Sequence, residues 1–203
     1  MTLRAVVFDV GETLVDEDRY WQDVARVAGV PRHVLLAALG VTIARGEDHR
    51  ALWGRLGMER PTAVDNVVYE RGDLHGDALP CLAATRAAGY AVALAGNQTA
   101  ALEEWTRSLN LPVDLVASSV SLGARKPHVA FFAGLVALLG RAPGEVAYVG
   151  DRVDNDVVPA VAAGLVAVHV RRGPWGRLQD ASGQAQLVVE SLAELPAALA
   201  SLA

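Results

Sequence analysis

The sequence has very few of the residues from which several kinds of site are built. Its 203 residues include one cysteine, Cys81, which excludes an intrachain disulfide and a cysteine-rich zinc or iron–sulfur site. The longest apolar run, residues 129–140, is shorter than the ~18 to 20 residues that cross a bilayer. No basic stripe extends beyond Arg171 and Arg172, and the net charge is −5, so neither nucleic acid nor a membrane is an expected partner. No signal-peptide pattern precedes the first apolar segment, and we expect a cytoplasmic protein.

Lysine is also almost absent. Of the 18 basic residues only Lys126 is a lysine, and the others are arginines. An ammonium is a compact charge with three donors, which a planar guanidinium does not reproduce, so Lys126 is a candidate for a specific role. The alternative is an ordinary lysine left on the surface.

What the chain does contain is apolar sequence, 52% of the residues, arranged as alternating strand and helix patterns. Short runs typical of strands buried on both faces occupy residues 5–10, 90–95, 113–117, 146–149, 165–170 and 187–189. Helical patterns occupy residues 78–88, 99–109, 128–139, 156–163 and 192–202. This alternation predicts an α/β fold, a Rossmann-like parallel sheet with helices on both faces.

Residues 17–76 interrupt this alternation. Helical patterns at residues 19–28, 31–44, 48–56 and 62–70 replace the short connection expected between the first two strands. We interpret residues 17–76 as a small helical cap over the strand ends. Residues 1–16 and 77–203 would then form the Rossmann-like core.

Polar residues follow the predicted strands at their carboxyl ends, where ligands bind in such sheets. Asp9 ends the first strand, Gly96 and Asn97 end the second, and Asp151 follows the fourth. Lys126 follows the third strand, and Pro127 is expected to open the next helix, whose N-terminus would attract anions.

Several carboxylates gather among these residues. Asp151, Asp154 and Asp156 lie within six residues of sequence. Hydrogen bonds to turn amides would explain Asp9, and a helix cap would explain Asn155 or Asp156, but a cap does not explain Asp151. If Asp9, Asp151 and Asp156 meet, a cation must offset their repulsion, and all-oxygen ligands favour Mg²⁺. With Lys126, such a site suits phosphoryl transfer through an aspartyl-phosphate on Asp9.

Four motifs together resemble the haloacid dehalogenase-like (HAD) hydrolases. They are the strand followed by DxxxTL at residues 9–14, the strand-end Asn97, the pair Lys126–Pro127, and GDxxxxD ending at Asp156. Their order, and helices inserted between the first two motifs, are similar to the family along the whole chain. The resemblance implies that Asp9 is the nucleophile and that Asp9, the Gly11 carbonyl and Asp151 bind Mg²⁺. It also implies that Asp156 supports the metal and that Lys126 steadies the nucleophile and the phosphoryl oxygens.

The sequence departs from the phosphatases of this family at two positions. Gly11 replaces the aspartate that acts as general acid and base, and Gly96 replaces the Ser or Thr that binds a phosphoryl oxygen. Only backbone amides near Gly96 and Asn97 would then bind that oxygen. Because a general acid is worth ~10²–10⁴-fold and an oxyanion donor ~10²–10³-fold, a slow or specialised catalyst is expected. Glu12 could replace the acid, or could simply be a solvated residue.

These observations favour a Mg²⁺-dependent phosphatase for a small phosphorylated metabolite, with an acyl phosphate, whose leaving group needs no proton, as one specialised substrate. One alternative is a catalytically silent regulatory module that binds Mg²⁺ and phosphate. Another is a 2-haloacid dehalogenase, which needs no Mg²⁺ and would leave the acidic cluster without a cation. A phosphonatase of the family is excluded because residues 17–76 contain no lysine for a Schiff base.

Specificity is expected to come from residues 17–76. Arg19 and Trp21 could line a pocket there, although a solvated arginine and a core tryptophan explain them as well. Four other residues fit either a pocket or an ordinary amphipathic helix: His33, Arg45, His49 and Trp53. Trp105 and Trp175 fit core packing or an interface between subunits, and the oligomeric state stays open with them.

Overall fold

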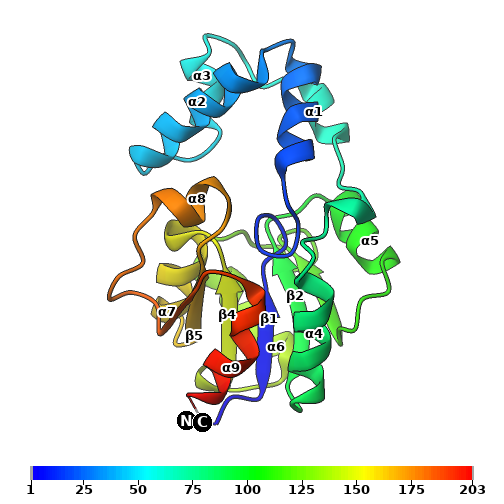
Figure 1. Cartoon of the computed structure of the whole chain (residues 1–203), viewed down its shortest axis with the longest axis vertical. Helices are drawn as coiled ribbons and strands as arrows, with labels where there is room; N and C mark the ends of the chain where they lie inside the picture. Colours follow the sequence, from blue (N-terminus) through cyan, green and yellow to red (C-terminus); the bar gives the residue numbers. More distant parts are fainter. Residues whose placement is uncertain (1, 203) are drawn as a thin grey trace.

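A six-stranded parallel sheet forms the centre of the molecule (Figure 1). The structure, a computed structural model, describes residues 2–202. The strands lie in the order β3-β2-β1-β4-β5-β6. Their bounds are β1 (Ala5–Phe8), β2 (Ala91–Gly96), β3 (Leu115–Ser118), β4 (Val146–Gly150), β5 (Val166–Val170) and β6 (Leu187–Val189). This confirms the expected Rossmann-like α/β fold. The strand order reverses direction between β1 and β4, where open α/β sheets bind their ligands.

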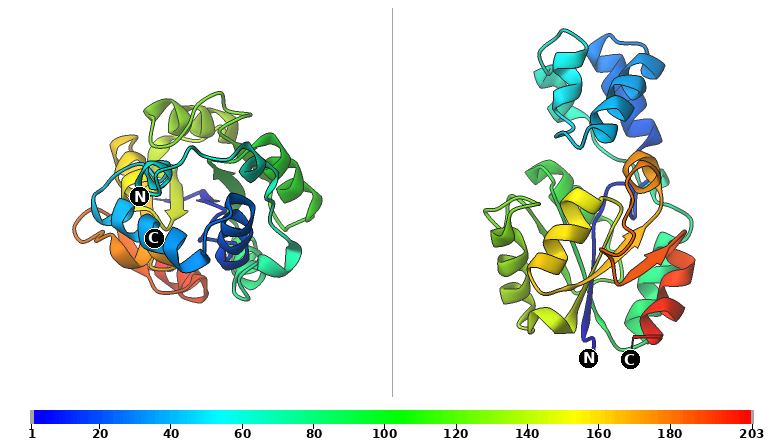
Figure 2. Two further views of the ribbon diagram at one scale, coloured as in Figure 1. Left: turned by 90° about the horizontal axis from the view of Figure 1, so that it is seen from above. Right: turned by 90° about the vertical axis from the view of Figure 1, so that its left-hand side faces the viewer.

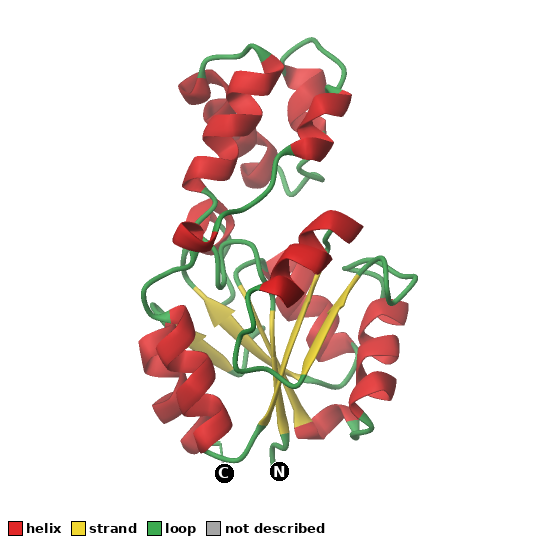
Figure 3. Ribbon diagram, turned by 90° about the vertical axis from the view of Figure 1, so that its right-hand side faces the viewer, coloured by secondary structure: helices red, strands yellow, loops and turns green. Residues whose placement is uncertain are grey.

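Helices cover both faces of the sheet (Figures 2 and 3). One face packs against α4 (Ala78–Ala87) and α9 (Leu195–Ala200), and the other against α6 (Val129–Leu139) and α7 (Val158–Ala162). Consecutive strand residues face opposite sides, so Phe8 belongs to the first of these two cores and Val7 to the second. The remaining helical elements beside the sheet are α5 (Ala100–Ser108), η3 (Pro143–Glu145) and η5 (Leu192–Glu194).

The segment between β1 and β2 forms a separate group of helices beyond the carboxyl ends of the strands (Figures 1 and 3). Its elements are α1 (Asp18–Ala28), α2 (Arg32–Ala44), α3 (Ala51–Arg55), η1 (Thr62–Asn66) and η2 (Arg71–Asp73). Trp21, Leu35, Leu39 and Trp53 belong to an apolar cluster of its own. The group therefore buries its apolar faces against itself above the sheet edge.

The helix predicted at residues 62–70 is wrong beyond Asn66. From Val67 the backbone is extended, and Val67 and Tyr69 are buried while Val68 between them is exposed. Burial with a period of two is typical of an extended segment and not of a helix. The apolar residues of this segment were therefore assigned the period of a helix, whereas they follow the period of an extended chain.

Two other boundaries differ from the prediction. Pro127 does not open α6, because the Lys126–Pro127 peptide is cis and His128, still extended, is the N-cap residue of a helix that begins at Val129. The predicted helix at residues 156–163 begins instead with a π-helical turn, η4 (Val153–Val157), in which the Asp156 carboxylate accepts the backbone N–H of Arg152 at 3.0 Å.

One helix was missed. The short α8 (Gly173–Leu178) follows β5 and begins with Gly173 at φ 63° and a proline in its first turn. Its Trp175 is buried against Trp21, with ring centroids 6.3 Å apart, so α8 joins the core to the helices above it. This packing supports the core interpretation of Trp175. Pro174 followed by a large aromatic residue was the available signal.

Within residues 2–202 no single helix is long and apolar enough to span a membrane. Only α1 and α2 taken together reach that length and composition, and they are bent by 111° at the break between them.

Candidate functional site

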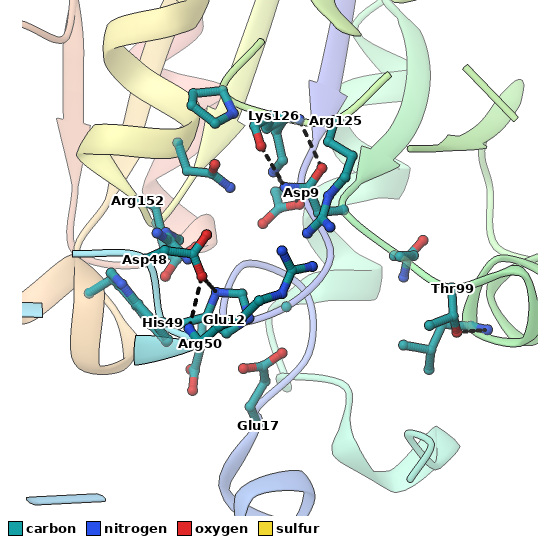
Figure 4. A pocket seen from close by; sticks show the side chains of 18 of the residues that line it. Asp9, Glu12, Glu17, Asp48, His49, Arg50, Thr99, Arg125, Lys126 and Arg152 are labelled. Atoms are coloured by element: carbon teal, nitrogen blue, oxygen red, sulfur yellow. Dashed lines mark hydrogen bonds and ion pairs between the residues drawn. The ribbon is translucent and has the colours of Figure 1, made fainter. Parts of the chain in front are cut away.

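Lys126 lies between two carboxylates at the carboxyl edge of the sheet (Figure 4). Its Nζ donates to Asp9 Oδ1 at 2.8 Å and to Asp156 Oδ1 at 2.6 Å. The Lys126 side chain is 1% exposed, so it is not a surface lysine. Asp9 is fixed because its backbone N–H donates to the Val149 carbonyl of β4 at 2.8 Å. The structure thus brings together residues from three predicted strand ends.

Burial and charge shape the titration of this group. Burial alone would lower the pKa of Lys126, but the carboxylates of Asp156 and Asp9 hold it well above its usual range. Burial raises the pKa of Asp9 to about 6, although the neighbouring ammonium of Lys126 opposes the rise. Lys126 is therefore a permanent cation that partly offsets the buried carboxylates.

Asp9, Asp151 and Asp156 form a compact acidic cluster. One carboxylate oxygen from each lies within 4.8 Å of the others. Asp151 Oδ2 is buried and has no hydrogen-bond partner among residues 2–202. Burial, followed by the charges of Asp156 and Asp9, raises the pKa of Asp151 well above its ordinary value. An all-oxygen set with a free, buried acceptor suits a hard divalent cation.

Asp154 stands apart from this cluster. Its carboxylate accepts from Arg152 Nη2 at 2.7 Å and from Gln179 Nε2 at 3.0 Å. Asp156 provides no side-chain cap for α7, and its oxygens are used by Lys126 and the Arg152 amide. The capping alternative therefore does not describe Asp156.

Gly96 and Asn97 have distinct structural roles at the end of β2. A Cβ atom at position 96 would lie 2.5 Å from Asp9 Oδ1, so a larger residue would collide with that carboxylate. Asn97 Oδ1 accepts the Lys126 N–H at 2.9 Å, and Asn97 Nδ2 donates to the Lys126 carbonyl at 2.9 Å. The Asn97 side chain is thus bound to the main chain that carries Lys126. Substrate binding by Gly96 and Asn97 stays a prediction.

Two glutamates accompany Gly11 in the loop after β1. Glu12 is buried, has φ 52°, and lies so close to Gly173 that a Cβ there would be 2.5 Å from its carboxyl carbon. Burial, with the charges of Glu17 and Asp16, raises the pKa of Glu12 to about 8. Burial also raises the pKa of Glu17, which sequence reasoning missed. The only available signal was its position shortly after the DxxxTL motif.

A cavity of about 1050 Å³ extends from the acidic cluster to the helices above it. Trp21, His49 and Trp53 line it, whereas His33 and Arg45 do not. Burial lowers the pKa of His49 to about 4. Four arginines that the sequence did not single out also reach it: Arg50, Arg60, Arg125 and Arg152.

Arg19 is not part of the cavity wall. Its guanidinium binds Asp73 at 2.6 Å and Asp23 at 2.8 Å while the side chain stays 30% exposed, so Arg19 is a partly solvated residue and not a pocket residue. Arg19 therefore connects α1 to η2.

Comparisons with known proteins found similar sequences. A family model described as HAD-hydrolase-like matches residues 123–195. The chain is 28% identical to a glyceraldehyde 3-phosphate phosphatase of Methanopyrus kandleri, over 85% of this chain and 86% of that protein. It is 32% identical to one of Methanocaldococcus jannaschii, over 46% of this chain and 42% of that protein.

Solved structures share the fold. A HAD phosphatase from Thermococcus onnurineus has a TM-score of 0.67 at 22% identity, covering 97% of this chain and 98% of its own. An L-2-haloacid dehalogenase from Xanthobacter autotrophicus has a TM-score of 0.69 at 21% identity, covering 100% of both chains. These matches show that the chain has the fold of the HAD-like hydrolases, and its residues 123–195 match their family model.

Proposed function

We propose that this chain is a Mg²⁺-dependent phosphatase that hydrolyses small phosphorylated metabolites through an aspartyl-phosphate on Asp9. The observation that carries the proposal is the cluster of Asp9, Asp151 and Asp156, in which a buried Asp151 oxygen has no partner among the described residues. Three buried carboxylates and a single ammonium leave an excess of negative charge. A divalent cation would offset that excess, and this supports Mg²⁺ at the site.

Each residue at the sheet edge has a proposed role. The carboxylates of Asp9 and Asp151 and the carbonyl of Gly11 would hold Mg²⁺, with Asp156 supporting them. Bound Mg²⁺ would neutralise charge on the transferring phosphoryl group. Lys126 keeps Asp9 in position and faces the same phosphoryl oxygens. Backbone amides at Gly96 and Asn97 would bind a phosphoryl oxygen.

The reaction has two displacements at phosphorus. An Asp9 oxygen forms a bond to phosphorus while the bond to the leaving oxygen breaks, and the leaving alcohol takes up a proton. Water then attacks phosphorus and loses a proton, the bond to Asp9 breaks, and phosphate is released. The Asp9 carboxylate is regenerated, so substrate and water give alcohol and phosphate.

The substrate is proposed to bind between two units of the chain, a core of residues 1–16 and 77–203 and a cap of residues 17–76. The cavity reaches both, because Asp9 of the core and Trp53 of the cap line it. Glyceraldehyde 3-phosphate, named for the two archaeal relatives, is the first metabolite to test.

A dehalogenase is a weaker candidate although solved dehalogenases share the fold. A halide-displacing aspartate needs no metal, and the acidic cluster would then lack a counter-charge. A silent binding module is disfavoured because Asp9 and Lys126 retain the geometry of an oriented nucleophile, with Nζ 2.8 Å from Oδ1.

The test is phosphate release from p-nitrophenyl phosphate, acetyl phosphate and glyceraldehyde 3-phosphate, with Mg²⁺ and with a chelator. We expect Mg²⁺-dependent turnover that disappears in Asp9→Asn. Asp154→Asn is the control, because Asp154 follows β4 like Asp151 and Asp156 but lies outside the acidic cluster, and it should keep most of the activity. Turnover that survives Asp9→Asn, or a folded protein without turnover on any of these substrates, would contradict the proposal.

A further inference from the structure

The carboxylate of Glu17 lies where a side chain at position 11 would be. A Cβ atom built on Gly11 would overlap Glu17 Oε1 and lie 3.2 Å from the Tyr69 hydroxyl oxygen. Real Cβ atoms do not approach other atoms so closely, so a side chain at position 11 and Glu17 in its present place exclude each other. The space beside Asp9 that Gly11 leaves open is therefore occupied by a carboxyl group from another part of the chain.

Two neutral donors fix the Glu17 carboxylate. Trp21 lies one turn further along α1, and its Nε1 donates to Glu17 Oε2 at 3.0 Å. The Tyr69 hydroxyl donates to Glu17 Oε1. Both donors are buried. No ion pair with an arginine or lysine holds Glu17 within residues 2–202. A carboxyl group bound only by neutral donors can exchange a proton without breaking an ion pair.

The group also faces the reaction centre. Glu17 and Asp9 line the same cavity, and Figure 4 shows the Glu17 carboxylate directed upward from α1 toward Asp9. The loop that carries Gly11 connects the two residues. A phosphoryl group bound at Asp9 would therefore have Glu17 on the side of the cavity where the leaving group departs.

We propose that Glu17 is the general acid and base of the phosphoryl transfer and takes the place of the carboxylate missing at position 11. This inference rests on the proposed phosphatase function. In the first displacement the Glu17 carboxyl group gives its proton to the leaving oxygen as the bond from that oxygen to phosphorus breaks. In the second, the Glu17 carboxylate takes a proton from water as the water oxygen bonds to phosphorus and the bond to Asp9 breaks.

Glu12, the other glutamate of the loop, is less suited to this role. Its carboxyl group packs against Gly173, where a Cβ atom would lie 2.5 Å from the carboxyl carbon, and no contact within residues 2–202 places it in the space that a side chain at position 11 would fill. Glu12→Gln is the matched control, because both residues are glutamates of the same loop that line the same cavity.

The experiment compares two leaving groups in the complete protein with Mg²⁺. Dinitrophenolate departs without a proton, whereas the alkoxide of glycerol phosphate needs one. In Glu17→Gln, kcat/KM for glycerol phosphate should fall ~10²–10⁴-fold while kcat/KM for dinitrophenyl phosphate changes by less than about tenfold. Because the second displacement also loses its base, a burst of dinitrophenolate equal to the enzyme concentration should precede slow turnover. Glu12→Gln should show neither effect.

The outcomes separate the inference from the proposed function. If the native protein shows no turnover of dinitrophenyl phosphate that depends on Asp9, the phosphatase proposal itself fails. If that turnover exists and Glu17→Gln alters both substrates equally, or alters neither, the assignment of Glu17 is wrong. The same conclusion follows if Glu12→Gln, and not Glu17→Gln, shows the dependence on the leaving group.

A second variant pair tests the shared space directly. Gly11→Asp alone introduces a side chain that overlaps Glu17 and should reduce activity and thermal stability. Glu17→Ala removes the obstacle. The double variant Gly11→Asp/Glu17→Ala should therefore hydrolyse glycerol phosphate at least about tenfold faster than Glu17→Ala does. A double variant no better than Glu17→Ala would overturn the idea that one carboxyl group substitutes for the other.

Discussion

Asn97 binds the main chain of Lys126 on both sides, accepting from its N–H and donating to its carbonyl, each at 2.9 Å. The two residues are 29 positions apart: Asn97 directly follows β2, and Lys126 lies in the loop between β3 and α6. The amide thus fixes the loop from which the only lysine reaches Asp9. A positioning role for Asn97 follows directly from these two contacts.

Asn97→Ala should reduce kcat on a phosphate monoester about 10- to 100-fold, because loss of both hydrogen bonds lets Lys126 shift from Asp9. Steady-state kinetics with Mg²⁺ would measure this, and KM should change less than kcat. Asn66→Ala is the control, since Asn66 is exposed on η1. Unchanged kcat in a folded Asn97→Ala variant would remove the positioning role.

Mg²⁺ should raise the melting temperature through the acidic cluster. At a concentration of 100 times Kd, a ligand stabilises by ~2.7 kcal/mol, which corresponds to about 5 to 10 °C in a chain of this size. Differential scanning fluorimetry would detect the shift. It should disappear in Asp151→Asn and persist in Asp154→Asn. An equal shift in all three proteins would place the bound ion elsewhere.

Asp77 and Arg172 join the start of α4 to the end of β5. Their side chains form two hydrogen bonds, of 3.0 and 2.5 Å, and Asp77 also accepts the Leu192 N–H at 2.9 Å. Asp77→Asn should lower the free energy of unfolding by about 1 to 3 kcal/mol, measured by urea denaturation at pH 7. Asp65→Asn, in an exposed pair with Arg60, should change the free energy of unfolding much less than Asp77→Asn does. Equal costs would contradict the assigned role.

The same pair gives a pH dependence. Partial burial alone would raise the pKa of Asp77, but the hydrogen bonds and charge of Arg172 lower it below its ordinary value. A carboxyl whose pKa is depressed in the folded state stabilises fully above its unfolded pKa, and this contribution is lost as the pH falls through the folded pKa. The stability difference between the native protein and Asp77→Asn should therefore be constant near neutrality and shrink below about pH 4. A stability difference between the two proteins that grows as the pH falls would contradict the lowered pKa of Asp77.

Cys81 should be unreactive in the folded protein. The residue is 2% exposed within α4, and burial raises the pKa of its thiol to about 11. Because the thiolate is the reactive form, alkylation by iodoacetamide at pH 8 should be slow. Unfolding in urea should restore rapid modification, followed by mass spectrometry. Fast labelling of the native protein would show that α4 opens locally.

The sequence predicted the sheet well because its strands are continuous apolar runs with a single interpretation. Five of them were placed within two residues, and β1 was predicted to extend only two residues too far, to Val10. The insert was harder, because short amphipathic segments depend on their partners. Residues 67–70 have apolar positions that fit either period, and only packing of Val67 and Tyr69 makes them extended.

The candidate site also has residues that the sequence predicts and residues that it does not. Asp9, Lys126, Asp151 and Asp156 follow strands, so the parallel sheet itself brings them together. Glu17 could not be identified by that rule, since its place depends on how α1 leaves the core and on two donors, Trp21 and Tyr69, that lie beside it only after folding. The glycine at position 96 could not be explained from a motif either. The Asp9 carboxylate occupies the space that a side chain at position 96 would fill, and this is seen only in the folded structure.

The packing of α8 against the helices above it has an optical consequence. Three of the four tryptophans, Trp21, Trp53 and Trp175, surround the cavity, and the Arg152 guanidinium lies 4.7 Å from the Trp175 ring centroid. An anionic ligand that bound Arg152 and moved it from the Trp175 ring would change the polarity around that indole. The chain's own ultraviolet emission therefore carries a signal of cavity occupancy without any added dye.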